Sequence, residues 1–194
     1  MPRIIVPIVE GHGEVAAVPL LLRRIACEML QFEVDVKKPI RLPKQKLQKA
    51  GELERALDLA TQKCEGPCGI LVLLDADEDC PREIGEQVLN RAATARPYAN
   101  VQVVLAKAEY EAWLLGAVES LLPETRKPLV DFNPREAENV RGAKEKLAEI
   151  LDIFYSETVD QPAFSSKFNL SQARANCPSF DKFRRAVQAL LEIG

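Results

Sequence analysis

The chain has 194 residues, enough for one domain with a buried core, and its 47% of hydrophobic residues excludes an intrinsically disordered chain. No apolar segment is long enough to cross a bilayer and the N-terminus lacks a signal-peptide core, so we expect a cytoplasmic protein with no membrane partner. The net charge of -3 excludes a protein that holds nucleic acid by bulk positive charge alone, but not a nuclease whose carboxylates bind a metal ion.

The five cysteines do not predict a disulfide framework. Their number is odd, and Cys64 and Cys68 have no second Cys/His pair with which to complete a zinc site. We therefore expect reduced cysteines with a structural role.

The first 106 residues alternate between short apolar segments and longer segments of helical period. The expected strands are Ile4–Val9, Phe32–Val36, Ile70–Leu74 and Val101–Ala106. The expected helices are Val15–Leu30, Leu47–Lys63 and Glu83–Ala95. This alternation predicts an α/β fold with a mostly parallel, four-stranded sheet flanked by helices. Ile70–Leu74 is apolar throughout and is the expected central strand.

Two prolines affect the first strand and the first helix. Pro7 lacks the N–H of a ladder residue, which favours an edge position or an irregular strand. Pro19 places the start of the helix near Gly13, with the proline in or just past the first turn.

The last third of the chain is expected to be helical. A helix over Glu109–Leu122 completes the α/β domain of residues 1–122. A proline-containing loop opens a helical C-terminal extension, residues 123–194, which packs on the same domain. The extension is expected to contain the helices Arg141–Tyr155 and Phe180–Ile193. Between them we expect Gln161–Ser179 to be a polar loop with a short helical turn, in which Ser179 is the N-cap.

Acidic residues surround the turn that follows the first expected strand, in the sequence VEGHGE of residues 9–14. Glu10 ends the strand and Glu14 opens the helix, so a tight glycine turn brings both carboxylates to one side of the sheet edge. This is the edge at which α/β proteins bind ligands. Two neighbouring carboxylates repel each other unless a proton or a cation lies between them.

Acidic residues also follow the two later strands. Asp75 and Asp77 come after Ile70–Leu74, and on extended backbone residues i and i+2 point the same way, which gives two oxygen ligands for Mg²⁺. Glu109 and Glu111 follow the fourth strand. Each group alone is typical of helix starts and solvated turns, but their shared position predicts one metal site.

A glutamate after the first strand and an Asp-x-Asp after a later strand resemble the signature of the Toprim family, which includes topoisomerases, primases and the nucleases associated with overcoming-lysogenization-defect ATPases. Glu10, Asp75 and Asp77 match this signature, and Glu10-x-x-x-Glu14 resembles the paired glutamates of the nuclease branch. Together, VEGHGE, LLDAD, EYEAW and PSFDKF resemble an uncharacterised bacterial family of Toprim relatives over nearly the whole chain. The resemblance implies a Toprim-like, Rossmann-like fold.

The resemblance also implies Mg²⁺- or Mn²⁺-dependent phosphoryl transfer on nucleic acid, with DNA ahead of RNA. Glu10, Asp75 and Asp77 would hold the first metal ion, while Glu14 and Glu111, with Glu109 as the alternate to Glu111, would bind a second ion or act as general base. Because no residue is placed as a nucleophile, hydrolysis by water is favoured over strand rejoining. No Walker A motif is present, so ATP use would require an ATPase partner, as in a defence or DNA-maintenance system.

Three basic residues are candidates for contacts with nucleic-acid phosphates: Lys144, Lys167 and Arg174. Lys144 is also a candidate for stabilising the transition state.

Two other functions fit the sequence. The first is a metal-binding, Toprim-like partner or regulator without catalytic activity. The second is a nucleotide-binding enzyme, since Gly11-His12-Gly13 begins a G-x-G-x-x-A pattern and Asp35 lies near the position at which that motif wants an acid. Against the second, Glu10 and Glu14 would oppose a pyrophosphate at the helix N-terminus.

Overall fold

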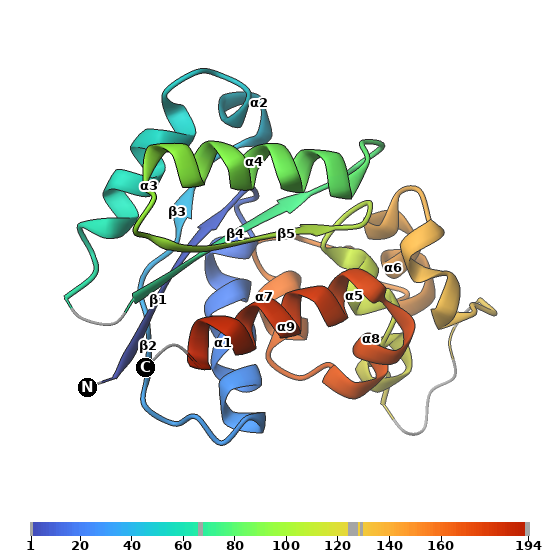
Figure 1. Ribbon diagram of the computed structural model, residues 1–194. Coiled ribbons are helices and arrows are strands. Elements are labelled where there is room, and N and C mark those ends of the chain that lie inside the picture. The colour runs from blue at the N-terminus through green and yellow to red at the C-terminus, as the bar shows by residue number, and fades with distance from the viewer. Residues whose placement is uncertain (1, 66–67, 124–127, 129, 193–194) are drawn as a thin grey trace.

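The computed structural model describes the chain except for residues 1, 66–67, 124–127, 129 and 193–194. A parallel sheet of five strands lies at its centre (Figure 1), with β1 (Arg3–Val9) and β4 (Cys68–Asp75) inside and β5 (Asn100–Ala106) at one edge. Two short strands, β2 (Val34–Val36) and β3 (Ile40–Arg41), share the other side of β1. The α/β fold with a parallel sheet is confirmed, and the short β3 is added to the four predicted strands.

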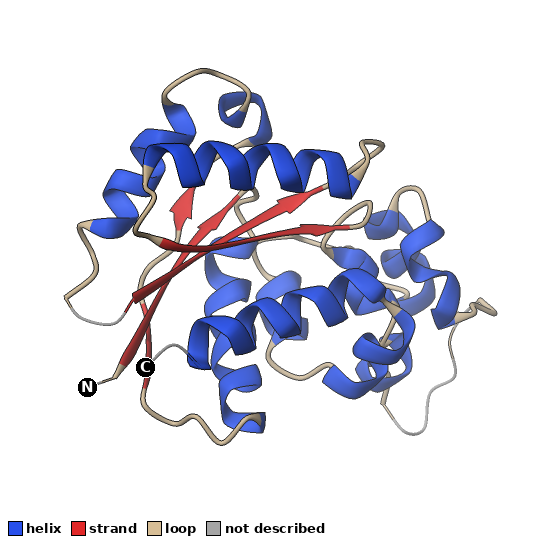
Figure 2. Cartoon of the chain, viewed as in Figure 1, coloured by secondary structure: helices blue, strands red, loops and turns tan. Residues whose placement is uncertain are grey.

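Helices cover both faces of the sheet, which gives three layers (Figure 2). One face is covered by α2 (Lys44–Leu47), α3 (Glu52–Thr61) and α4 (Pro81–Ala95). The opposite face is covered by α1 (Glu14–Glu28) and α9 (Pro178–Glu192). Because side chains alternate along a strand, residues such as Ile8 and Val9 enter opposite cores, and both cores are fully apolar around the central strands.

The remaining helices lie beside α1 and α9 at the end of the sheet where the strands finish (Figure 1). They are α5 (Glu111–Leu115), α6 (Ala143–Leu151), α7 (Asp160–Ser165), α8 (Leu170–Asn176) and the 3₁₀ helices Val118–Leu121 and Pro134–Asn139. They join one hydrophobic core with α1 and the sheet, in which Trp113 packs against Phe180 and Phe183. Both halves of the chain therefore contribute to this core, and the boundary at residue 122 stays a prediction.

The expectation that Pro7 marks an edge or irregular strand is wrong, because β1 is an inner strand. The carbonyl oxygens of Ile5 and Val9 accept hydrogen bonds from Lys37 and Leu42, so the backbone of every second residue, Pro7 included, faces the side of β2 and β3. Pro7 falls between the end of β2, opposite Ile5, and the start of β3, opposite Ile8. Its missing N–H coincides with this break, so no ladder bond is lost.

The helical character of the last third is confirmed, but several details differ. The expected loop Gln161–Ser179 contains most of α7 and all of α8, and the expected helix Glu109–Leu122 is divided into α5 and a 3₁₀ turn. Ser179 is not an N-cap, because α9 already begins at Pro178 and the Ser179 hydroxyl accepts the indole N–H of Trp113 at 2.7 Å. Part of the expected loop at Pro123–Pro134 lies outside the described residues.

The cysteines are not all reduced, since a disulfide joins Cys64 and Cys68. The expectation was wrong because the chain brings their Cα atoms to 5.5 Å, within the range that a disulfide spans. Within the described residues, no helix is both long enough and apolar enough to span a membrane.

Close packing of α9 on the sheet depends on Gly69 in β4. A Cβ atom at this position would overlap the side chain of Leu190 on α9. We expect Gly69→Ala to lower the free energy of unfolding by ~1–3 kcal/mol, as overpacked cores do, in urea titrations followed by circular dichroism. Leu190→Ala removes most of the overlap, so the double variant should lose less than the sum of the two single variants. Strict additivity would contradict this contact.

Candidate functional site

The carboxyl ends of β1, β4 and β5 lie side by side, and each is followed by an acidic residue. This arrangement follows from the parallel order of the strands, and it brings the predicted carboxylates together. The backbone N–H of Asp75 donates to Glu10 Oε2 at 3.2 Å, and the backbone N–H of Glu10 donates to Glu14 Oε2 at 3.0 Å. The predicted proximity of Glu10 to Asp75 is therefore present in the structure.

Two of these acids are buried at helix starts. Glu14 is the first residue of α1 and is 2% exposed, and Glu111 is the first residue of α5 and is 0% exposed. Glu111 Oε1 accepts hydrogen bonds from the Tyr155 hydroxyl at 2.8 Å and the Gln161 side-chain amide at 3.1 Å. Among the described residues, Glu111 Oε2 and Asp75 Oδ1 are buried oxygens without a hydrogen-bond partner. Unsatisfied buried carboxylate oxygens are unfavourable unless a proton or a cation compensates them.

The electrostatics of the cluster agree with this description. Burial raises the pKa of Glu14 to about 8, and the charges of Glu10 and Glu111 add to that effect, while backbone hydrogen bonds from Glu10 and Gly11 oppose it. Burial also raises the pKa of Asp75 well above its usual value, with further contributions from the charges of Glu14, Glu111 and Glu10. The pKa values of Glu10 and Glu111 are raised by burial as well. The carboxylate cluster, defined as Glu10, Glu14, Asp75 and Glu111, therefore favours a bound proton or cation.

Lys144 on α6 is a cation of this site. Its ammonium forms an ion pair with Glu157, and its positive charge lowers the pKa values of Asp75 and Glu111. Burial acts to lower the pKa of Lys144, but the hydrogen bond to Glu157 and the charges of Glu111 and Glu109 outweigh burial and raise it. The Lys144 side chain therefore stays protonated. Glu109 lies beside it, since Glu109 Oε2 accepts the backbone N–H of Lys144 at 3.3 Å.

The sequence predicted that Asp75 and Asp77 point the same way, and this prediction is wrong. The extended backbone ends at Asp75, and Asp77 lies in a turn with φ of 51°, in the left-handed region. Its carboxylate forms an ion pair with Lys44 at 2.7 Å and is 54% exposed. The negative charge of Asp77 still raises the pKa of Glu10, so Asp77 lies at the rim of the cluster.

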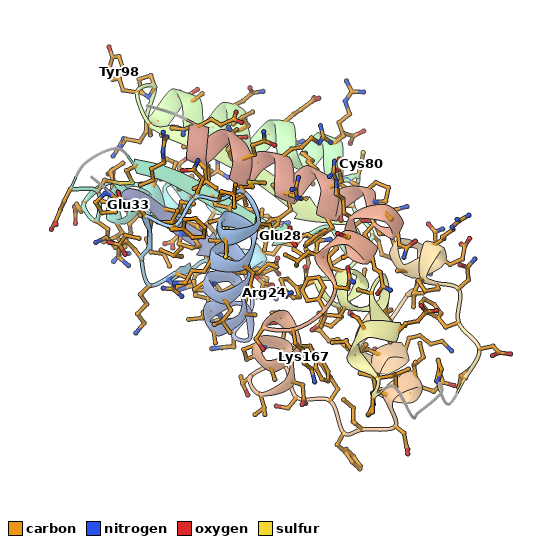
Figure 3. All side chains as sticks on the ribbon, turned by 90° about the horizontal axis from the view of Figure 1, so that it is seen from below. Arg24, Glu28, Glu33, Cys80, Tyr98 and Lys167 are labelled. Carbon is orange, nitrogen blue, oxygen red and sulfur yellow. A yellow bond between two sulfur atoms is a disulfide. The ribbon has the colours of Figure 1, made fainter. Side chains whose placement is uncertain are left out.

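Lys167 and Arg174 were also predicted to contact phosphates, but no interaction found among the described residues links either side chain to the cluster. Lys167 is exposed at the turn between α7 and α8 (Figure 3), and its ammonium lies 5.4 Å from the centre of the Phe164 ring. Arg174 on α8 forms an ion pair with Asp181 on α9 at 2.8 Å.

Four site residues were not found from the sequence: Tyr155, Gln161, Glu157 and Lys44. The first three belong to the connection after α6 and the start of α7, whose polar composition resembles any surface loop. Tyr155 carries one weak signal, since an aromatic residue after a helix often packs back on the core, and here it stacks with Phe164 at 6.3 Å.

The donor chemistry of the cluster fits a hard divalent cation, because Mg²⁺ prefers carboxylate oxygens and two of these oxygens are buried without partners. In the arrangement of the described residues, however, no three acidic, histidine or cysteine side chains are already placed to hold a metal ion. Metal binding therefore requires rotation of side chains, for example of Glu14 away from the Glu10 backbone.

Comparison with known proteins gave one match. A family described as a domain of unknown function, DUF4276, matches residues 9–188 of the chain, a span that contains every carboxylate of the cluster. No curated protein and no solved structure matched.

The turn before α1 has no room for a side chain at Gly13. A Cβ atom there would overlap the backbone carbonyl of Glu157 and the side chain of Gln161. We expect Gly13→Ala to displace this connection and to destabilise the protein by ~1–3 kcal/mol in thermal or urea unfolding. Gly51→Ala provides contrast, since nothing lies within 4 Å of its Cβ position and only its φ of +82° opposes the change. If Gly13→Ala were no less stable than the parent, the described contact would be wrong.

The raised pKa of Glu14 makes stability depend on pH in a fixed direction. A carboxyl group with a higher pKa in the folded protein retains its proton there while the unfolded chain has lost it, so stability falls as the pH rises from about 4.5 to about 8. In metal-free buffer we expect Glu14→Gln to flatten this decline and to melt higher than the parent at pH 8. One pH unit of displaced titration corresponds to about 1.4 kcal/mol.

Glu33→Gln, at an exposed site outside the cluster (Figure 3), should leave the pH dependence of the melting temperature unchanged. A Glu14→Gln variant with the parent's pH profile would contradict the assigned burial of that carboxyl group.

Proposed function

The chain belongs to the DUF4276 family, and we propose that it hydrolyses phosphodiester bonds of nucleic acid with Mg²⁺ or Mn²⁺ bound at the carboxylate cluster. The observation that carries the proposal is the convergence of four carboxyl groups from three adjacent strand ends. Two of these carboxyl groups, those of Asp75 and Glu111, have a buried oxygen without a hydrogen-bond partner among the described residues. A purely structural cluster of this kind would keep its destabilising repulsion without any benefit.

Glu10, Glu14, Asp75 and Glu111 are the residues that would hold the metal. When bound, the ion would polarise the scissile phosphate and stabilise charge on the leaving oxygen. Asp77 could join them through its other carboxylate oxygen, because Lys44 is paired with Oδ2. Rotation of the Glu14 side chain would also free the N–H of Glu10, which is then available to a phosphate oxygen.

The chain's own residues support hydrolysis by water. Burial and the neighbouring charge of Glu111 raise the pKa of Tyr155, so its hydroxyl stays neutral and is a poor nucleophile. Tyr155 instead orients Glu111. Once ionised, a cluster carboxylate with a raised pKa is a stronger base toward the proton of an attacking water. Lys144, which stays protonated, can contact a phosphate oxygen.

The resemblance to the Toprim family supports the same function, because the matching residues Glu10, directly after β1, and Asp75, the last residue of β4, are in contact at the ends of neighbouring strands. We extend the proposal to DNA as the preferred substrate and to an ATPase partner, since no Walker A motif is present in the chain.

The nucleotide-binding alternative is less favoured by the geometry. The Glu14 carboxylate lies in the turn before α1, where its Oε2 already accepts the N–H of Glu10 and its charge would oppose a pyrophosphate. Asp35 pairs in register with Ile4, near the opposite end of β1 from the glycine turn, and its carboxylate forms an ion pair with Lys37. No ribose contact next to Gly11 can come from that position.

Metal binding can be tested separately from cleavage. Mg²⁺ at about 100 times its Kd should add about 2.7 kcal/mol of stability, which raises the melting temperature by about 5–10 °C. Asp75→Asn should abolish this increase, and without metal it should melt above the parent, because one repelling charge is gone. Asp131→Asn, an exposed residue outside the cluster, serves as the control. An unchanged Mg²⁺ effect in Asp75→Asn would refute the metal assignment.

Cleavage is tested with plasmid DNA and Mn²⁺. We expect nicking by the parent protein and its loss by at least about 100-fold in Asp75→Asn and Glu111→Gln, as for other removed electrostatic groups of active sites. A protein that binds the metal through these residues but cuts neither DNA nor RNA would support the non-catalytic partner function instead.

A further inference from the structure

The edge strand β5 lies at the bottom of a groove. The groove has a volume of about 530 Å³ and runs between α4 on one side and α9 on the other. Figure 1 shows these two helices on either side of β5, which has no neighbouring strand on its outer side. The floor of the groove includes Val101, Val103 and Leu105.

The backbone at this edge has unused hydrogen-bonding groups. The carbonyl oxygen of Ala106 accepts the N–H of Ala76 beyond the end of β4, so the even-numbered residues of β5 bond toward β4 and the odd-numbered ones face outward. The next outward N–H, that of Lys107, donates to the Ser179 hydroxyl at 3.2 Å and so ends the free edge.

Among the described residues, no partner is found for the outward N–H and C=O groups of Val101, Val103 and Leu105. A free edge of this kind is a template for an added strand, which native proteins usually cover or block.

The walls of the groove combine apolar and charged side chains, of which the basic ones (Arg82, Lys107, Lys182 and Arg185) outnumber the acidic ones (Glu86 and Glu138). Leu89 on α4 is 43% exposed at the groove, and Lys107 and Lys182 reach it without a carboxylate partner among the described residues. Gly85 leaves space for the Lys182 ammonium, which lies 3.8 Å from the position of a Cβ atom there.

We propose that this groove binds an extended acidic segment of a partner protein, which adds to β5 as a further strand. The backbone groups of Val101, Val103 and Leu105 would supply the ladder bonds, while Lys107 and Lys182 would pair with acidic side chains of the segment. A second copy of this chain is a poorer occupant, because pairing of two β5 edges would bring the basic side chains of both copies together.

The proposal is tested by fluorescence anisotropy with the full chain and a labelled eight-residue peptide of alternating glutamate and valine. A peptide in which lysine replaces glutamate is the charge control. We expect binding of the acidic peptide alone, and a loss of about tenfold or more in affinity for Lys182→Glu. Lys49→Glu, an exposed residue on the turn after α2, is the matched control and should bind as the parent does. No binding, or equal binding of both peptides, would overturn the proposal.

Two further measurements distinguish strand addition from charge attraction. Two peptides are compared, one N-methylated at the odd-numbered residues and one at the even-numbered residues. Only one of the two should lose binding, because only one edge of the peptide faces β5. Hydrogen exchange of the amides of Val103 and Leu105 should slow when the acidic peptide is bound. Loss of binding by neither peptide, or unchanged exchange, would rule out an added strand.

Light scattering tests the other occupant directly. We expect the parent protein to be a monomer. If it is a dimer, and Lys182→Glu changes the fraction of dimer, the groove binds a second copy and the proposal is wrong.

Discussion

Repulsion among the four carboxyl groups of the cluster is the constraint on which the rest of the site depends. Burial removes the water that would screen them, so Glu14 and Asp75 have raised pKa values and buried oxygens remain without partners. Lys144 and backbone donors relieve part of this repulsion. A divalent cation would relieve it more completely, and this is the physical basis of the proposed metal site.

The helical C-terminal region takes part in this site. The connection after α6 covers the glycine turn before α1, and it supplies Tyr155 and Gln161, which hold one oxygen of Glu111 and leave the other free. Asp77, which by sequence looked like a ligand, instead forms an ion pair with Lys44 at the rim. The helical region therefore contributes to the cluster not only through Lys144, which the sequence suggested, but also through Tyr155 and Gln161.

The two proposed sites share β5. Its outer edge forms the floor of the groove, and the residues that follow it, through Glu109 to Glu111, enter the carboxylate cluster. Ser179 connects the regions physically, because its hydroxyl accepts both the Lys107 N–H and the indole N–H of Trp113, two residues after Glu111. A partner strand on β5 would thus bind next to the segment that positions Glu111.

The sequence by itself determined the α/β fold, the four main strands and the placement of acids after three of them, because alternation of apolar segments and parallel strand order leave few other arrangements. Tertiary structure alone decided which acids are buried. Asp75 and Asp77 are two residues apart, yet the end of β4 separates them into a buried ligand candidate and an exposed ion-pair partner. Long-range packing also placed Tyr155 and Gln161 against Glu111, since such contacts depend on how distant elements meet rather than on local pattern.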